Sequence, residues 1–327
     1  MRRMGLAGVV LAVVFLTMVG SASASTLCLQ LKANGAVKGP TTVGGNTCKS
    51  GYEKVELPAA AELETLNKIL PHTKYEEKGV AGKPTIQFSG VNVQLVSGSG
   101  GTAGAVNGEG NLVIGYDENT EKHEQIGSHN LIVGMEHTFT SFGGIVGGFA
   151  NTISGEFATV IGGDINVAGP GVGASVSGGI GNIASGGASS VSGGESNVAE
   201  GLKASVSGGN FNKASGERAW IGGGESNVAS NENTAVSGGD SNVASGEEAS
   251  VSGGLKNTAS AKETWVGGGG ENTASFTEAS VSGGFFNTAS GENASVSGGT
   301  ENKAEGRYSS IFGGKKLTAK GESEAIP

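Results

Sequence analysis

The side chains that could carry out chemistry in this chain are few, and most lie outside its most regular part. The four histidines are His72, His123, His129 and His137. His129 and His137, with Glu136 beside them, could in principle hold a metal ion, but no cysteine is near and no helical spacing brings two of them onto one face. We interpret them as polar residues of an irregular β segment. The sequence predicts no catalytic, cofactor-binding or metal-binding residue, and we expect a protein that is not an enzyme.

Glycine-rich sequence produces chance matches to phosphate-binding loops, and none here follows a predicted strand and opens a helix. The Gly-Gly-Asp triplets at 162–164 and 238–240 are isolated and do not form a calcium-binding repeat. We therefore expect no cofactor. The formal net charge of −9 argues against nucleic acid and anionic membrane surfaces as partners.

Trp220 and Trp265 are the best candidates for a ligand-contact patch. They lie forty-five residues apart, which is three periods of the repeat described next, so they fall on one side of the molecule roughly 14 Å from each other. Two interpretations stay open: an exposed contact patch, or cover for a lateral groove between chains.

Asparagines recur at a fixed step of fifteen residues through the second half of the chain: Asn182, Asn197, Asn212, Asn227, Asn242, Asn257, Asn272, Asn287 and Asn302. One unit reads A-S-V-S-G-G-x-x-N-x-A-S-G-x-x, with a β-branched third position and an alanine eleventh position. This alternation predicts two short strands per unit. We expect Gly-Gly to form one corner and the asparagine, in the left-handed region, to form the next. A disordered low-complexity segment is the alternative, but disorder would not preserve both apolar positions over ten units.

The repeat thus predicts an all-β fold, a β-solenoid or β-roll over 143–320 of about eleven coils with a tail at 321–327. One valine and two small residues per coil bury on the order of 250 Å², worth about 6 kcal/mol, against about 20 kcal/mol of ordering entropy. Because this deficit is large, we expect several chains to assemble side by side as a homo-oligomer, with a trimer as the preferred state.

Residues 1–24 have the pattern of a secretory signal peptide. Arg2 and Arg3 precede an apolar run from Leu6 to Val19, and Ala22-Ser23-Ala24 offers a cleavage site. A membrane anchor is the alternative, but the run is short for that role. We expect a protein that is secreted or held at the cell envelope surface, with no membrane insertion after cleavage.

Cys28 and Cys48 are the only cysteines. In an exported chain this pair predicts one disulfide, closing a small β-hairpin module over 25–57; free or metal-binding thiols are the alternative.

A short helix is expected over 58–71, between Pro58 and Pro71. Leu63, Leu66 and Leu70 have the spacing of a coiled-coil seam, which would suit a neck between chains. Packing against the chain's own β domain explains the same spacing equally well. Over 84–142 we expect an irregular β cap, with alternation at Ile86 and Phe88 and again at Val91, Val93 and Leu95.

The repeat pattern resembles the head repeats of trimeric autotransporter adhesins, the YadA-like family. The resemblance covers about 110 to 320 and rests on Asn130–Gly134, Ser141–Gly148, Asn151–Gly155 and the Ala-Ser-Val-Ser-Gly-Gly units. It implies a left-handed parallel β-roll, three chains wide, that binds extracellular matrix or neighbouring cells. Because the repeats continue to about Ala319, we expect no C-terminal translocator barrel of the kind that family carries. The strand also reads Ala-Ser-Val-Ser-Gly in place of Ser-Val-Ala-Ile-Gly. No ligand-binding residue is therefore carried over.

We expect an adhesin-like structural or binding protein whose partners are itself and possibly matrix, glycan or a neighbouring cell surface. A passive structural spacer is the first alternative. The second is an ice-binding solenoid with a flat serine face, formed by ladders such as Ser175, Ser205 and Ser250.

Overall fold

The structure is a computed structural model that describes residues 26–29, 42–44, 50, 53–56 and 60–327. Contacts divide the chain into two units, Met1–Val93 and Gln94–Pro327, which we describe separately. The predicted signal peptide and Cys48 lie outside the described residues. Cys28 lies in a described strand, but its side chain is not described, so the Cys28–Cys48 disulfide stays a prediction.

The first unit contains a small antiparallel sheet, one helix and a hairpin. Strand β1 (Thr26–Leu29) lies between β2 (Thr42–Gly44) and β3 (Glu53–Glu56). Helix α2 spans Ala60–Ile69 and passes into the 3-10 turn η1 (Leu70–His72), where Pro71 ends the α-helical hydrogen bonding. The short helix predicted over 58–71 is therefore present, although Leu70 already belongs to the 3-10 turn.

After the helix, β4 (Thr73–Glu76) and β5 (Thr85–Phe88) form an antiparallel pair around the turn η2 (Val80–Gly82). The alternation at Ile86 and Phe88 lies in β5 as expected. The alternation at Val91, Val93 and Leu95 does not produce a strand, because these residues have no neighbouring strand to pair with in the described chain, and their side chains are exposed.

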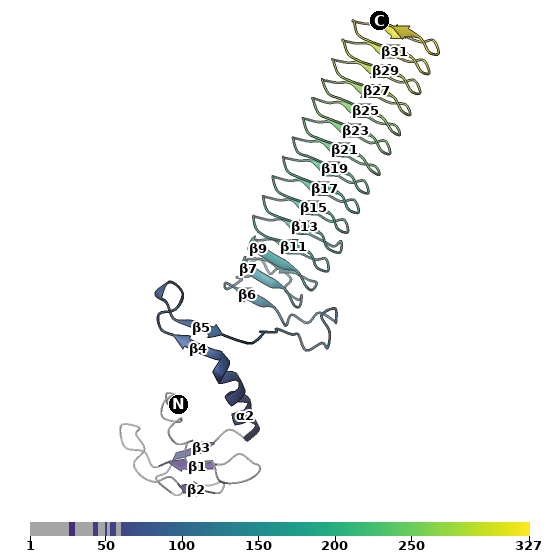
Figure 1. The fold of residues 1–327 in the computed structure, drawn as a ribbon. Helices are drawn as coiled ribbons and strands as arrows, with labels where there is room; N and C mark the ends of the chain where they lie inside the picture. Colours follow the sequence, from purple (N-terminus) through teal and green to yellow (C-terminus); the bar gives the residue numbers. More distant parts are fainter. Residues whose placement is uncertain (1–25, 30–41, 45–49, 51–52, 57–59) are drawn as a thin grey trace. The chain divides into compact units, whose positions relative to one another are not determined.

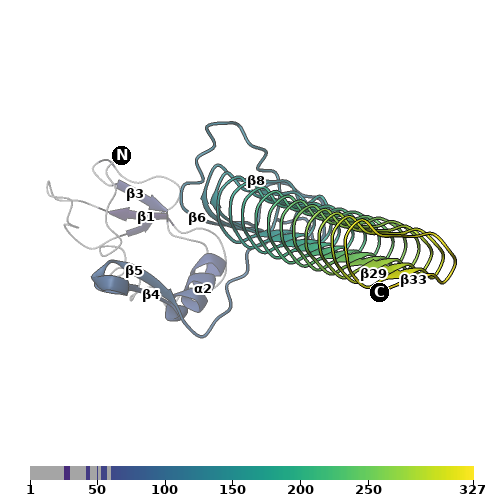
Figure 2. The same cartoon turned by 90° about the horizontal axis from the view of Figure 1, so that it is seen from above.

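The second unit is a parallel β-solenoid of about 14 coils (Figures 1 and 2). Each regular coil gives one strand to a fifteen-stranded sheet and one to a thirteen-stranded sheet, which follow one another around the coil. The first sheet consists of β6 (Leu112–Ile114), β7 (Leu131–Met135), β9 (Ile145–Phe149), β11 (Thr159–Val160), β13 (Ser175–Val176), β15 (Ser190–Val191), β17 (Ser205–Val206), β19 (Trp220–Ile221), β21 (Ala235–Val236), β23 (Ser250–Val251), β25 (Trp265–Val266), β27 (Ser280–Val281), β29 (Ser295–Val296), β31 (Ser310–Ile311) and β33 (Ala325–Ile326).

The second sheet consists of β8 (Thr138–Phe139), β10 (Thr152–Ile153), β12 (Val167–Ala168), β14 (Ile183–Ala184), β16 (Val198–Ala199), β18 (Lys213–Ala214), β20 (Val228–Ala229), β22 (Val243–Ala244), β24 (Thr258–Ala259), β26 (Thr273–Ala274), β28 (Thr288–Ala289), β30 (Lys303–Ala304) and β32 (Thr318–Ala319). The solenoid has more coils than the eleven expected, because the irregular segment from Leu112 onward also coils. At about 4.8 Å per coil the stack is roughly 65 Å long.

The interior of each coil is filled by small apolar side chains from both sheets. In the coil Ala174–Ala188, Ala174, Val176 and Ala184 are fully buried, while Ser175 and Ile183 face outward. The same alternation repeats in every regular coil, because the parallel register aligns valine on valine and alanine on alanine. The predicted two-strand unit and its apolar positions are confirmed.

The repeated asparagine is an interior residue and not a corner residue, so that part of the prediction is wrong. Asn242 is fully buried, and its backbone N–H donates to Oδ1 of Asn227 at 2.9 Å. Its Nδ2 donates to the carbonyls of Gly238 and Gly254, both at 2.9 Å, and its Oδ1 accepts from Asn257 N at 3.0 Å. We call the continuous series of such bonds from Asn151 to Asn302 the asparagine ladder.

The left-handed corners fall on other residues. The second glycine of each pair has positive φ, as at Gly254 (φ 91°), which confirms the predicted glycine corner. The residue before each asparagine is also left-handed, as at Phe211 (φ 56°), and so is the last residue of each unit, as at Arg218 (φ 56°). Exposed residues other than glycine can occupy these two corners, because backbone hydrogen bonds between neighbouring coils stabilise the left-handed conformation. One example is the bond from Phe211 N to Glu195 O at 3.0 Å.

The ladder also changes the energetic argument for assembly. Besides one valine and two small residues, each coil buries an asparagine whose hydrogen bonds also stabilise the coil. In the structure a single chain encloses its own coil interior completely. Any need for a second chain must therefore come from the outer surface and not from an unfilled interior.

Replacing Asn242 by alanine should strongly destabilise the solenoid. The change leaves the carbonyl of Gly238 and the N–H of Asn257 without partners in a closed interior, and the carbonyl of Gly254 keeps only the Asp240 N–H. We expect this to cost about 3 kcal/mol or more. Urea denaturation followed by circular dichroism measures this loss. Ser237→Ala, on the outer surface of the same coil, is the control and should stay within about 0.5 kcal/mol of wild type. Equal stability of the two variants would show that the ladder is not needed for folding.

Candidate binding face

The outer surface of the fifteen-stranded sheet is uncharged and rich in serine from β13 to β31. From β13 to β31, each coil exposes the second and fourth residues of its unit. We call these twenty residues the serine face, and they are Ser175, Ser177, Ser190, Ser192, Ser205, Ser207, Trp220, Gly222, Ala235, Ser237, Ser250, Ser252, Trp265, Gly267, Ser280, Ser282, Ser295, Ser297, Ser310 and Phe312. None of them is charged, although the chain as a whole carries a net charge of −9.

Charged side chains gather instead at the coil corners. Arg218 pairs there with Glu217 and Glu232, Lys262 with Glu247 at 3.4 Å, and Arg307 with Glu292 at 3.1 Å. Glu247 holds the pKa of Lys262 above its usual value. Apart from Arg218–Glu217, which lies within one coil, these pairs join neighbouring coils at the surface, where each contributes little to stability. Their placement leaves the serine face electrically neutral between charged edges.

Trp220 and Trp265 occupy equivalent places on the serine face, as their spacing predicts. Trp220 is paired with Ser205 and Ala235, and Trp265 with Ser250 and Ser280. Their side chains are 39% and 40% exposed, so each indole is more than half covered by the sheet on which it lies. The two rings are three coils apart, at roughly 14 Å.

A glycine two residues after each tryptophan lets the indole lie down on its own strand. A Cβ added to Gly222 would meet the carbonyl oxygen of Ser237 at 2.5 Å and Cη2 of Trp220 at 3.0 Å. One added to Gly267 would meet the carbonyl oxygen of Ser282 at 2.6 Å and Cη2 of Trp265 at 2.8 Å. The other regular coils have serine at this position, with Phe312 in the last. Sequence reasoning missed these two glycines, and the signal was the exchange of serine for glycine in the two coils that carry tryptophan.

The polar atoms of the serine face are largely without protein partners. Trp265 Nε1 donates to Ser252 Oγ at 3.2 Å, and this is the only side-chain hydrogen bond of the face among the described residues. The remaining hydroxyls and the Trp220 Nε1–H have no hydrogen-bond partner among the described residues. The face can therefore offer two flat aromatic rings and two interrupted rows of hydroxyl groups to a ligand.

The free energies of burying the indoles and of desolvating the serine hydroxyls favour a polar partner over an apolar one at this face. Each indole leaves on the order of 100 Å² exposed, worth about 2.5 kcal/mol if buried. An outward hydroxyl pressed against an apolar surface costs about 1–3 kcal/mol. Fourteen of the twenty residues are serine, so a contact that left their hydroxyls unpaired would cost more than the two tryptophans contribute. A partner rich in hydroxyl groups avoids that cost.

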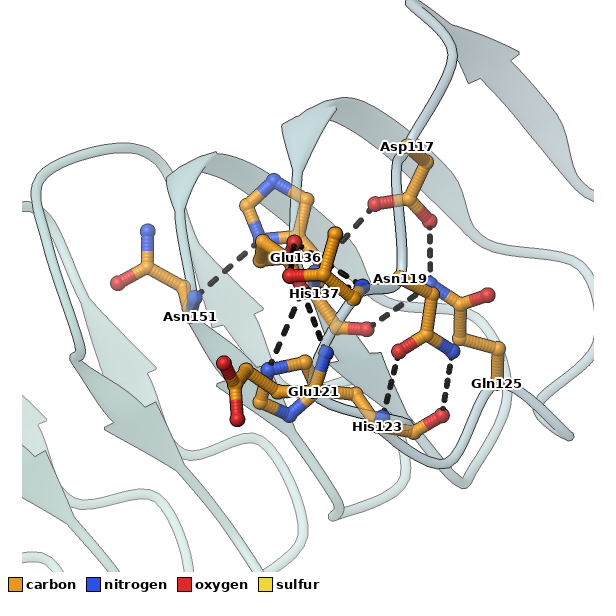
Figure 3. A network of polar contacts seen from close by, with 9 residues as sticks. Asp117, Asn119, Glu121, His123, Gln125, Glu136, His137 and Asn151 are labelled. Atoms are coloured by element: carbon orange, nitrogen blue, oxygen red, sulfur yellow. Dashed lines mark hydrogen bonds and ion pairs between the residues drawn. The ribbon is translucent and has the colours of Figure 1, made fainter.

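His123, His137 and Glu136 lie in the first coils and have structural contacts (Figure 3). His72 lies in the other unit, where its Nδ1 is 3.0 Å from the carbonyl oxygen of Ser89. Glu136 is nearly buried and accepts hydrogen bonds from the backbone and hydroxyl of Thr120, and it lies 3.6 Å from His123 Nε2. The Thr120 hydroxyl is the main cause that lowers the pKa of Glu136, with further contributions from the backbone N–H groups of Thr120 and Glu121 and from His123. Asn119 fixes the same loop through two bonds to the backbone of His123.

His137 takes the place of an asparagine at the first rung of the ladder. Its Nδ1 accepts from Asn151 N at 3.3 Å, and its Nε2 donates to the carbonyl of Val133 at 3.2 Å. Its backbone N–H donates to Asp117, whose pKa is raised by burial against the opposing effect of that bond. At the far end Leu317 N donates to Asn302 Oδ1, and no side-chain amide continues the series there.

His129 has a separate role. Its Nε2 accepts from Ser97 N at 2.9 Å and its Nδ1 donates to Thr102 O at 3.2 Å, so it holds the glycine-rich loop beside a hollow of about 450 Å³. His129 and His137 thus use their ring nitrogens on different backbone groups. Within the described part of the chain, no three histidine, cysteine or acidic side chains come together as a metal site would require.

Leu66 and Leu70 are exposed, and nothing is described of the Leu63 side chain. The predicted seam of Leu63, Leu66 and Leu70 therefore has two members open to a partner within the described residues.

Among all the residues that the structure describes, no helix is both long enough and apolar enough to cross a membrane.

Comparison with known proteins does not assign the chain to a group. No protein-family model matches it, and no curated protein is similar to it. The parallel solenoid is the class of protein that the structure defines.

Lowering the pH should release the loop around Glu136. Because the folded-state pKa of Glu136 lies below 4.5, its charged form stabilises the loop above pH 4.5, and this contribution is lost as the pH falls through the folded-state value. Amide exchange at Thr120 and Glu121, measured from about pH 3 to about pH 7 and corrected for intrinsic rates, should show protection that disappears at the acid end.

Glu136→Gln should remove most of this pH dependence, whereas Glu124→Gln, an exposed change in the same loop, should preserve it. Equal pH dependence in wild type and Glu136→Gln would contradict the assignment.

Proposed function

We propose that this protein is an exported, non-enzymatic, homo-oligomeric β-solenoid that acts as an adhesin-like binding element at the cell surface or in the surrounding matrix. The observation that carries the proposal is the serine face, an uncharged flat surface with two aromatic rings on a rigid stack of coils. The signal-peptide pattern of residues 1–24 supports export. The resemblance of the repeats to YadA-like heads supports a trimer and an adhesive role.

Exposed apolar side chains in the first coils support self-association. Leu112, Ile114, Val133, Met135, Ile145 and Phe149 form what we call the apolar patch; they lie on adjacent strands β6, β7 and β9 and are each 38–55% exposed. Apolar patches of this kind are rare on monomeric proteins and mark interaction sites. Leu66 and Leu70 add a second exposed apolar surface in the other unit.

The apolar patch and the serine face belong to the same sheet but suit different partners. The patch is apolar and can be buried against a second copy, whereas the serine face would lose hydration of its hydroxyls in such a contact. Assembly through the first coils and the helix therefore leaves the serine face free to bind another molecule.

The two alternatives draw on other observations. A passive spacer needs only the rigid stack and gives no role to the tryptophans. Ice binding would use unbroken rows of threonine. On the outer surface of the thirteen-stranded sheet, Thr258, Thr273 and Thr288 form such a row, but Val243 precedes it and Lys303 follows it. The regular row is therefore three coils long, which favours the adhesive proposal.

We expect the mature chain, beginning at residue 25, to have three times the chain mass by light scattering coupled to size-exclusion chromatography. Val133→Glu together with Ile114→Glu should lower the mass if the apolar patch forms the contact, and Leu66→Asp with Leu70→Asp should lower it if the helix does. Ser205→Glu together with Ser207→Glu places the same charges on the serine face and should leave the mass unchanged. A wild-type mass equal to one chain at micromolar concentration would refute assembly.

Binding is tested on an array of glycans and extracellular matrix proteins. An adhesive role is supported if any of them retains the wild-type protein more strongly than the variant Ser205→Glu with Ser207→Glu, which adds two charges to the serine face. Absence of retention on every surface would leave the spacer as the correct function.

A further inference from the structure

We propose that the serine face binds a neutral, linear polysaccharide that runs along the stack of coils and lies on Trp220 and Trp265. This inference rests on the proposed adhesive function and names the class of its ligand. Sugar rings have one or two apolar faces edged by hydroxyl groups, so they stack on flat aromatic rings and exchange hydrogen bonds with hydroxyl rows.

The two indoles have the geometry of stacking platforms. Each lies over a glycine of its own strand, because Gly222 and Gly267 leave no Cβ to push the ring upright. Both remain about 40% exposed after this covering. A side chain placed there only to fill a gap in the interior would be buried, as Val236 and Val266 are.

The hydroxyl rows have the spacing that such a ligand needs. Ser177, Ser192 and Ser207 form a row on successive coils that leads to Gly222, against which the Trp220 indole lies. Ser237 and Ser252 continue the same row toward Gly267. Their hydroxyls are exposed, and Ser252 alone accepts a protein hydrogen bond. Coils are about 4.8 Å apart, and a sugar unit in an extended chain advances by a similar distance, so hydroxyls of the chain can meet successive serines.

The charge distribution selects a neutral ligand. The serine face carries no charge, while its two edges carry exposed acidic residues outside the ion pairs described above, Glu248 and Glu278 at one edge and Glu225 and Asp240 at the other. A sulfated or uronic acid polymer would meet these carboxylates at close range, within the screening length of physiological salt. A neutral polymer pays no such penalty. A protein strand is also disfavoured, because the strands under the face are hydrogen-bonded on both sides and offer no free edge.

Affinity electrophoresis of the mature protein tests the proposal, in gels that contain hydroxyethyl cellulose or soluble xyloglucan, with hyaluronate and polygalacturonate as anionic comparisons. Pull-down on insoluble cellulose and chitin extends the neutral set. We expect retention by at least one neutral polymer and none by the anionic ones.

The decisive variant is Trp220→Ser with Trp265→Ser, which restores the serine found at this position in most coils and so preserves the fold. We expect its retention to be at least about tenfold weaker. Phe211→Ala with Phe286→Ala removes two exposed aromatic rings from the corners and should bind like wild type.

A second variant tests whether binding depends on how the indoles of Trp220 and Trp265 lie, and not only on their presence. Gly222→Ser with Gly267→Ser keeps both tryptophans but places a Cβ against each indole and against the carbonyl oxygens of Ser237 and Ser282 in the next coil. The strand and the indole must both shift, and we expect weaker retention. Circular dichroism and thermal melting confirm that each variant is folded.

Three results would overturn the proposal. The first is no retention of the wild type by any neutral polymer, and the second is equal retention of the wild type and the Trp220→Ser, Trp265→Ser variant. The third is a lower oligomeric mass for that variant, which would place the tryptophans between copies. Retention by a matrix protein alone would refute the polysaccharide and leave the adhesive function standing, whereas a monomeric wild type that still bound polysaccharide would refute only the assembly.

Discussion

The buried asparagine amide is the interaction on which the rest of the solenoid depends. A chain that turns a sharp corner every few residues exposes backbone carbonyls to its own interior, and these must find donors. One side chain per coil meets this need by donating to a glycine carbonyl of its own coil and to another in the next coil, while its oxygen accepts the N–H of the following asparagine, as at Asn242 and Asn257. Because each rung depends on the next, the asparagines stay in register, and the bond is kept at 2.9 Å even where one extra residue separates Asn166 from Asn182.

This internal constraint separates the roles of the two surfaces of each strand. The inner residues are restricted to valine or isoleucine, asparagine and alanine, with serine or threonine in place of the first alanine in some coils, as at Ser189 and Thr234. They must fit against closely similar neighbours above and below. The outer residues bear no such restriction, so Ser205, Trp220 and Ala235 follow one another in the same row without disturbing the pairing of Val206, Ile221 and Val236 beneath them. The solenoid can thus change its outer surface without changing its core.

The sequence predicted the parts of the fold that depend on periodicity. The two strands per unit, their inward valine and alanine and the glycine corner all follow from spacing and residue type. The position of Asn242 did not, because asparagine is frequent both in left-handed corners and in buried ladders, and the one-dimensional pattern is the same for each. The corner role fell to residues such as Phe211 and Arg218, whose types give no hint of positive φ.

For the candidate site, the row shared by Trp220 and Trp265 could be predicted from their forty-five-residue separation. The contact of each indole with Gly222 or Gly267 was not predicted, because the exchange of serine for glycine in those two coils shows a missing side chain but not that the ring lies over it. The apolar patch was also missed as a surface, because Val133 and Ile145 read as ordinary strand residues until the structure shows which of them face outward.

The uniform step of the coils has a genetic consequence. Duplication or loss of one forty-five-nucleotide segment adds or removes a whole rung without a frameshift and without a new junction to fold. Between Gly222 and Trp265 such an event would alter the interval from one indole to the other by a single coil. The lineage that carries this gene could therefore adjust the distance between its aromatic rings in discrete increments, by recombination alone and with no compensating change elsewhere.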